Sequence, residues 1–220
     1  MDLQHCIVVI GGDAPSTPLP GALGPDAVVV AADSGVDHAL ALGLRVDVAV
    51  GDFDSVTPAG LDEARAGGAR VESHPSAKDH TDLELALEAA VATGAGTITV
   101  VGGDGGRRDH LFANLLVLAA PRFAAPTITA YLGATRVHVV HGGRRRPITG
   151  EPGELVTLLP VHGDAAGVRT EGLRYPLANE TLPAGTSRGV SNVLERSPAS
   201  VAVSAGTVVV VLPGAQDEGA

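Results

Sequence analysis

Short apolar runs rich in valine, isoleucine and alanine alternate with helix-like stretches along residues 1–133 of the chain. The apolar runs predict buried strands at Cys6–Ile10, Ala27–Ala31, Val46–Val50, Thr97–Val101 and Thr127–Leu132. The stretches between them predict helices at Val36–Leu42, Pro58–Ala66, Thr81–Thr93 and His110–Ala120, each followed by a glycine or a proline. Strands that alternate with helices of about ten residues are typical of a mostly parallel sheet, so we predict an α/β fold here.

The pattern changes near residue 134, where helical periodicity ends. Strand candidates follow at Arg136–Val140, Glu154–Val161, Gly167–Leu177, Ser200–Ser204 and Thr207–Leu212. Ala205 and Gly206 separate the last two candidates and predict a two-residue hairpin turn, whereas the basic stretch Gly142–Gly153 predicts a link. We therefore predict two domains, residues 1–133 with an α/β fold and residues 134–220 built only from strands.

The charge balance excludes some classes of partner. The 220 residues carry 25 acidic side chains against 15 lysines and arginines, a net charge of −10. This balance argues against nucleic-acid and membrane-surface binding, because both need a basic face. No apolar run approaches the roughly 20 residues that span a bilayer, and the N-terminus lacks the basic segment of a secretory signal. With the single cysteine Cys6 and hence no disulfide, we expect a soluble, cytoplasmic protein without nucleic-acid or membrane partners.

Paired acids follow the strand predicted at Val46–Val50, in the sequence Gly51-Asp52-Phe53-Asp54-Ser55. In an extended exit, positions i and i+2 point the same way, so the carboxylates of Asp52 and Asp54 would lie side by side with Phe53 turned inward. Adjacent carboxylates repel each other unless a cation lies between them, and hard oxygen ligands suit Mg²⁺. The alternative is structural, with Asp52 capping a turn and Asp54 beginning the next helix.

A second acidic segment, Lys78 to Glu84, precedes a predicted helix. Thr81 and Glu84 fit a capping box, and Asp82 would lie in the first turn, where acids are ordinary stabilisers. Lys78 is the only lysine among the 15 cationic residues. Its compact ammonium group would suit phosphate oxygens, although a general preference for arginine also explains why lysine is absent elsewhere.

A glycine-rich segment follows the strand predicted at Thr97–Val101. Gly102–Gly106 would let the backbone approach a phosphate closely, and Arg107 can bind oxygens through two hydrogen bonds. The segment matches neither the P-loop pattern nor G-x-G-x-x-G, so it is weak on its own. Ligands of open α/β sheets bind at the carboxyl ends of the strands. Acids and glycines at three such places therefore predict a site for a nucleotide and a metal ion.

Five motifs occur in order along the chain: GDFDS at 51–55, KDHTDLELAL at 78–87, GGDGGRRDHLFAN at 102–114, GLRYPL at 172–177 and GVSN at 189–192. Together they resemble the bacterial thiamine pyrophosphokinase family, also called thiamine diphosphokinases. The resemblance implies transfer of a pyrophosphoryl group from ATP to the hydroxyl of thiamine, giving thiamine diphosphate and AMP. It also implies an α/β/α catalytic domain followed by a β-sandwich thiamine-binding domain, in a homodimer with its site between the subunits.

The resemblance implies roles for individual residues as well. The Mg²⁺ ligands that it implies are Asp52, Asp54 and Asp82. The ATP contacts are Lys78, Asp79, Thr81, Gly103, Gly105, Gly106, Arg107 and Asn114. The catalytic residues are Asp54, Asp82, Asp109 and Lys78, with either Asp82 or Asp109 taking the hydroxyl proton. Tyr175 stands where the family packs an aromatic ring on thiamine, and Ser191 and Asn192 stand at its substrate-contacting Ser-Asn.

Two positions depart from the family pattern. Ser34 follows Asp33 where the family usually has glycine, and Val193 follows Asn192 where an acid is common. Three other interpretations of the motifs stay open: a related pyrophosphokinase acting on a hydroxymethyl-pterin, a non-catalytic sensor of nucleotide or thiamine, and a metal-dependent phosphohydrolase. Product analysis separates them, because they predict a different acceptor, no AMP, and release of inorganic phosphate respectively.

Overall fold

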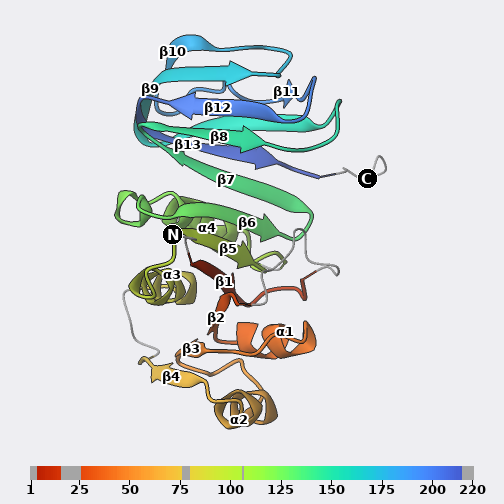
Figure 1. The fold of residues 1–220 in the computed structure, drawn as a ribbon, viewed down its shortest axis with the longest axis vertical. Coiled ribbons are helices and arrows are strands. Elements are labelled where there is room, and N and C mark those ends of the chain that lie inside the picture. The colour runs from red at the N-terminus through yellow and green to blue at the C-terminus, as the bar shows by residue number, and fades with distance from the viewer. Residues whose placement is uncertain (1–3, 16–25, 76–79, 106, 215–220) are drawn as a thin grey trace. The chain divides into compact units, whose positions relative to one another are not determined.

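The computed structural model describes residues 4–15, 26–75, 80–105 and 107–214. The chain divides into two units (Figure 1). The first unit comprises Met1–Val117 and Ala125–Gly133, and the second comprises Leu118–Ala124 and Ala134–Ala220. Up to residue 133 the elements are β1 (His5–Val9), β2 (Val28–Ala32), α1 (Gly35–Ala41), β3 (Val48–Gly51), α2 (Pro58–Ala66), β4 (Arg70–Ser73), α3 (Asp82–Ala92), β5 (Thr97–Val101), α4 (Arg108–Leu118), the 3₁₀ helix η1 (Pro121–Phe123) and β6 (Thr127–Leu132). The mixed α/β class predicted above is confirmed.

The strands of the first unit pair in parallel in the order β4-β3-β2-β1-β5-β6. In the register, Cys6 of β1 lies beside Val28 of β2 and Ile98 of β5. Because these strands run in the same direction, the loops after β1, β2, β3 and β5 leave one edge of the sheet. That edge is where ligands of such sheets bind.

Alternating strand positions build the core of this sheet. Ile7 and Val9 of β1 pack with Val29 of β2, Val36 of α1 and Ala64 of α2 in one apolar cluster. Helix α3 contacts β1, β2 and β3 and buries Leu83 and Leu87. None of the helices among the described residues is long and apolar enough to cross a membrane.

Strand β4 is missing from the predicted elements, although α2, β5 and β6 have the predicted bounds. Its sequence RVES contains no apolar run, so hydrophobic periodicity does not find it. It lies at the end of the strand order, and charged side chains on an edge strand discourage pairing with other chains.

Beyond residue 133 the described chain forms the strands β7 (Thr135–His141), β8 (Arg144–Ile148), β9 (Leu155–Glu171), β10 (Ala178–Leu182), β11 (Asn192–Val193), β12 (Ala199–Val203) and β13 (Ala205–Leu212). Their pairings are antiparallel, in the order β7-β13-β9-β12-β8 with β10 and β11 also on β9. The 17-residue β9 therefore pairs directly with four other strands.

Two predictions for this unit are wrong, and a third is right only in part. The proposed link Gly142–Gly153 contains strand β8, whose proline is tolerated because β8 ends the strand order. The proposed hairpin at Ala205 and Gly206 does not form, because both residues belong to β13 and Ala205 pairs with Ala166 of β9. Strands β12 and β13 each pair with β9 instead of with each other. The candidate Gly167–Leu177 is right only up to Glu171, where β9 ends.

His138, one of the two histidines of β7, is 6% exposed and makes stability depend on pH. Burial, and then the charges of Arg146 and Arg136, lower the pKa of its imidazole to about 3. The unfolded chain binds this proton below about pH 6.5, so the free energy of unfolding falls as the pH drops from there towards 3. We expect the free energy of unfolding, measured in urea, to fall between about pH 7 and 5 in wild type. In His138→Gln this fall should be about 2 kcal/mol smaller. Equal losses in the two proteins would contradict this assignment.

Candidate functional site

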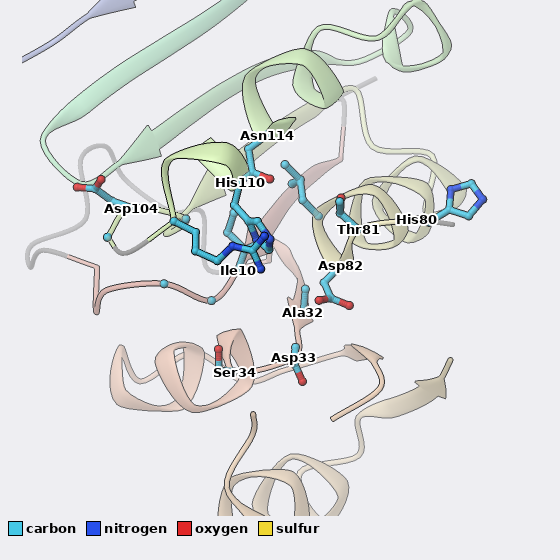
Figure 2. Close-up of a pocket in the computed structure, with 16 residues that line it drawn as sticks. Ile10, Ala32, Asp33, Ser34, His80, Thr81, Asp82, Asp104, His110 and Asn114 are labelled. Carbon is cyan, nitrogen blue, oxygen red and sulfur yellow. The ribbon is translucent and has the colours of Figure 1, made fainter. Parts of the chain in front are cut away.

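A cavity of about 300 Å³ lies at the carboxyl edge of the parallel sheet (Figure 2). Its walls come from the exits of β1 and β2, the beginning of α3, the loop after β5 and the first turns of α4. The residues that line it are Ile10, Gly11, Gly12, Ala32, Asp33, Ser34, His80, Thr81, Asp82, Leu83, Gly103, Asp104, Gly105, Arg107, His110 and Asn114. The predicted ATP contacts Thr81, Gly103, Gly105, Arg107 and Asn114 are thus brought together, whereas Lys78, Asp79 and Gly106 lie outside the described residues.

One wall of the cavity consists of two backbone segments bonded to each other. The Gly103 amide donates to the Gly11 carbonyl and the Asp13 amide to the Asp104 carbonyl, both at 2.7 Å. Gly103 has a φ of 76°, and a Cβ there would lie 3.2 Å from Asn114 Nδ2. Only glycine fits this conformation without strain. The glycines therefore let this wall close tightly, and they leave peptide groups beside the cavity.

Three carboxylates, those of Asp33, Asp52 and Asp54, gather where β2 and β3 end, with ligand atoms all within 4.8 Å of one another. Asp33 is 9% exposed, and its buried Oδ1 has no hydrogen-bond partner among the described residues, while Ser55 Oγ donates to Oδ2. A buried, unpartnered carboxylate oxygen is costly unless a cation neutralises it. Oxygen donors of this kind suit Mg²⁺, so these residues fit a hard divalent cation.

Asp33 is a site residue that the sequence reasoning missed. It directly follows β2, just as Asp52 directly follows β3, so the signal that identifies it is an acid just after the buried run at Ala27–Ala31. Its φ of 51° is unusual for a residue other than glycine, and Phe53 between the paired acids has a φ of 60°. Strained backbone of this kind is common at functional sites.

Helix α3 presents Asp82 and Thr81 to the cavity. Thr81 Oγ1 accepts a hydrogen bond from the Glu84 amide at 3.3 Å, which confirms Thr81 as the N-cap. Glu84 Oε1 lies 2.7 Å from Nδ1 of His80. Figure 2 shows the Asp82 side chain extending from the start of α3 towards the side on which Asp33 and Ser34 lie. Asp82 is not one of the three clustered carboxylates, but it borders the same cavity.

Asp109 is held by Arg107. Arg107 Nε and Nη2 donate to the two oxygens of Asp109 at 3.2 Å and 2.5 Å. These hydrogen bonds lower the pKa of the Asp109 carboxyl to about 2, although both side chains are exposed and water weakens the pair. Asp109 is not among the residues that line the cavity. An ionised, paired carboxylate is a weak base, which limits its use as a proton acceptor.

The second unit holds the predicted substrate contacts Tyr175, Ser191 and Asn192. Asn192 is 5% exposed, and its side chain accepts from the Tyr175 amide at 3.0 Å and donates to the Tyr175 carbonyl at 2.8 Å. The Tyr175 side chain is left 61% exposed, which is inconsistent with a role in core packing. Ser191 is exposed, with a φ of 58° and its amide bonded to Thr157 Oγ1 at 3.2 Å. Asn192 therefore holds the backbone that presents the Tyr175 ring.

Both parts of the chain are similar to known proteins. The chain matches the family model "Thiamin pyrophosphokinase, catalytic domain" over residues 22–130 and the model "Thiamin pyrophosphokinase, vitamin B1 binding domain" over residues 145–208. It is 25% identical to the thiamine pyrophosphokinase of Bacillus subtilis (strain 168) over 205 residues, 93% of this chain and 96% of that one. Two similar solved structures are thiamine pyrophosphokinases. The one from Bacillus subtilis has a TM-score of 0.82 at 24% identity and covers 97% of this chain and 100% of its own. The one from Geobacillus thermodenitrificans has a TM-score of 0.79 at 27% identity, covering 98% and 99%.

Proposed function

Because the chain belongs to the thiamin pyrophosphokinase family, we propose that it transfers a pyrophosphoryl group from ATP to the hydroxyl of thiamine, giving thiamine diphosphate and AMP. The observation that carries this proposal is the cavity at the carboxyl edge of the sheet, beside three clustered carboxylates, in the part of the chain that matches the catalytic model. Nothing in the comparisons favours a pterin acceptor.

We propose a division of labour between the two parts of the chain. Residues 1–133 would form an α/β/α catalytic domain for ATP, and residues 134–220 a β-sandwich that binds thiamine. The family resemblance further supports a homodimer with its site between subunits. A cytoplasmic location agrees with ATP as the pyrophosphoryl donor and with Cys6 as the single cysteine of the sequence.

We propose that Asp52, Asp54 and Asp82 hold Mg²⁺, with Asp33 as a further ligand. The support is the clustering of Asp33 with Asp52 and Asp54 and the buried, unpartnered oxygen of Asp33. When bound, Mg²⁺ neutralises negative charge on phosphate oxygens. The protein's own part is to bring the carboxylates of Asp33, Asp52 and Asp54 close together at one edge of the sheet, beside the cavity that Asp82 borders.

The proposed reaction is an in-line displacement at the β-phosphorus. The thiamine hydroxyl oxygen forms a bond to this phosphorus, the bond from the phosphorus to the bridging oxygen of AMP breaks, and AMP leaves. Asp82 is the better placed acceptor for the hydroxyl proton, because it borders the cavity, whereas Asp109 does not line the cavity and is paired with Arg107. Positioning of ATP falls to the proposed contacts Lys78, Asp79, Thr81, Gly103, Gly105, Gly106, Arg107 and Asn114.

The test of the function is a product assay with two acceptors. The protein is incubated with ATP and Mg²⁺ and with either thiamine or a hydroxymethyl-pterin, and AMP and the diphosphorylated product are measured. We expect AMP and thiamine diphosphate in equal amounts, with thiamine only. Phosphate release without an acceptor would instead indicate a phosphohydrolase, and binding without AMP would indicate a sensor.

Tyr175 gives a prediction for the thiamine side of the reaction. The thiamine ring is cationic, and stacking on an aromatic face stabilises such a ring. We expect Tyr175→Ala to raise the KM for thiamine about tenfold, leaving the KM for ATP unchanged. The control is Tyr175→Phe, which keeps the ring and should keep the wild-type KM. An unchanged KM for thiamine in the alanine variant would show that Tyr175 does not bind thiamine.

A further inference from the structure

Ser34 stands between β2 and α1, and its hydroxyl does not do what a serine in this position usually does. An N-cap serine normally accepts a hydrogen bond from an amide of the first helical turn. Ser34 has helical backbone angles, φ −58° and ψ −12°, and its side chain makes no cap hydrogen bond. It lines the cavity instead, and Figure 2 shows its hydroxyl turned towards that space. The hydroxyl is thus positioned to meet a bound molecule.

Gly11, at the exit of β1, creates the space that this hydroxyl occupies. A Cβ on Gly11 would overlap Ser34 Oγ but would lie an ordinary 3.8 Å from Ser34 Cβ. Gly11 is not among the glycines with positive φ, so its backbone would accept alanine. Its carbonyl accepts the 2.7 Å hydrogen bond from the Gly103 amide. The hydroxyl therefore lies against a residue that is bonded to the glycine-rich loop.

The charges around the cavity explain why a bound phosphate group would need a hydrogen-bond donor such as the Ser34 hydroxyl. Its described lining residues include three acids, Asp33, Asp82 and Asp104, and one arginine, Arg107. A polyphosphate held among so many acids needs hydrogen-bond donors as well as cations to balance the acids around it. A hydroxyl supplies one, and phosphate oxygens are strong acceptors.

We propose that Ser34 Oγ donates a hydrogen bond to a phosphate oxygen of the bound nucleotide and that Gly11 keeps the hydroxyl in this orientation. This inference rests on the proposed function only in taking ATP as the occupant of the cavity. It makes Ser34 a nucleotide-binding residue and Gly11 a positioning residue that acts through it.

The first test removes the hydroxyl. Binding of α,β-methylene-ATP, whose α–β bridge resists cleavage, is measured by calorimetry, and the KM for ATP is measured in the thiamine assay. We expect Ser34→Ala to weaken analogue binding and raise the KM for ATP about tenfold, with the KM for thiamine unchanged. The matched control is Ser204→Ala in the second unit. Wild-type affinity in Ser34→Ala would overturn the proposal.

The second test is a double-mutant cycle with Gly11→Ala. In the Ser34 protein the new methyl group forces the hydroxyl out of place, so we expect a similar, about tenfold loss of analogue affinity. In the Ser34→Ala protein the overlap is absent, so Gly11→Ala should add no further loss. Additive losses would overturn the role of Gly11. Thermal unfolding identifies any folding defect of Gly11→Ala, which the double variant should repair.

The outcomes for this inference and for the proposed function can be told apart. A wild type that binds the analogue but makes no thiamine diphosphate would contradict the proposed function, while the measured affinities of the variants would still decide whether Ser34 binds the nucleotide.

Discussion

Asp54→Asn is expected to abolish AMP formation from ATP and thiamine, with turnover falling at least about a thousandfold. Asp54 is one of three carboxylates whose oxygens lie within 4.8 Å of one another. An amide keeps the shape of the side chain but loses the negative charge and one anionic oxygen, so the cluster holds a divalent cation much less well. Because Asp54 is exposed, the fold should survive, and thermal unfolding should show a transition near that of wild type.

The same loss is expected for Asp82→Asn, since Asp82 borders the cavity and is the proposed proton acceptor. The matched control is Asp62→Asn on α2, where the carboxylate is 76% exposed and bonded to Arg65 at 3.2 Å. This control should keep wild-type turnover, measured as AMP released at saturating ATP, thiamine and Mg²⁺. Near-normal turnover in both Asp54→Asn and Asp82→Asn would disprove the metal assignment.

Gly35→Ala is expected to lower the free energy of unfolding of the first unit by about 3 kcal/mol. Gly35 begins α1 and is buried where the helix crosses the end of β1. A Cβ there would lie 2.7 Å from the carbonyl carbon of Val9 and 3.0 Å from Cα of Ile10. These neighbours are backbone atoms of a central strand, which cannot rotate aside as a side chain could. The helix would have to move away from the sheet.

Urea unfolding followed by circular dichroism measures this effect. The control is Gly67→Ala at the end of α2, where φ is −72° and a Cβ would lie 3.4 Å or more from its neighbours. That change should alter stability by less than about 0.5 kcal/mol, because alanine adopts the same conformation. If Gly35→Ala were as harmless as its control, the close packing of α1 on β1 would be refuted.

Elements with strong periodicity or clear end signals were predictable from the sequence. Helix α2 begins at Pro58 after the N-cap Thr57 and ends before Gly67, as predicted, and Thr57 Oγ1 accepts from the Gly60 amide at 3.0 Å. Elements stabilised only by their partners were not predictable. Arg144–Ile148 carries the charge and proline of a link, but it becomes a strand because β12 offers a complete set of backbone partners. Pairing across distant segments leaves no local signal.

The candidate site was predictable as a set of strand exits but not as a set of contacts. Acids after buried strands indicated Asp52 and Asp54, and the same argument covers Asp33. The pairing of Asp109 with Arg107 depends on side-chain geometry that spacing does not reveal. The burial of Asn192 could not be foreseen either, because an asparagine after serine in a polar segment is typical of an exposed turn.

The hydrogen bonds of Asn192 have a consequence for how this protein can evolve. They bind the amide and carbonyl of residue 175, groups that nearly every amino acid offers, and they leave the side chain of Tyr175 unconstrained. A mutation at position 175 can therefore exchange the exposed side chain without rebuilding the loop beneath it. Under the role proposed for Tyr175, ligand preference and loop architecture are encoded at separate positions, and selection can act on the first while the second stays intact.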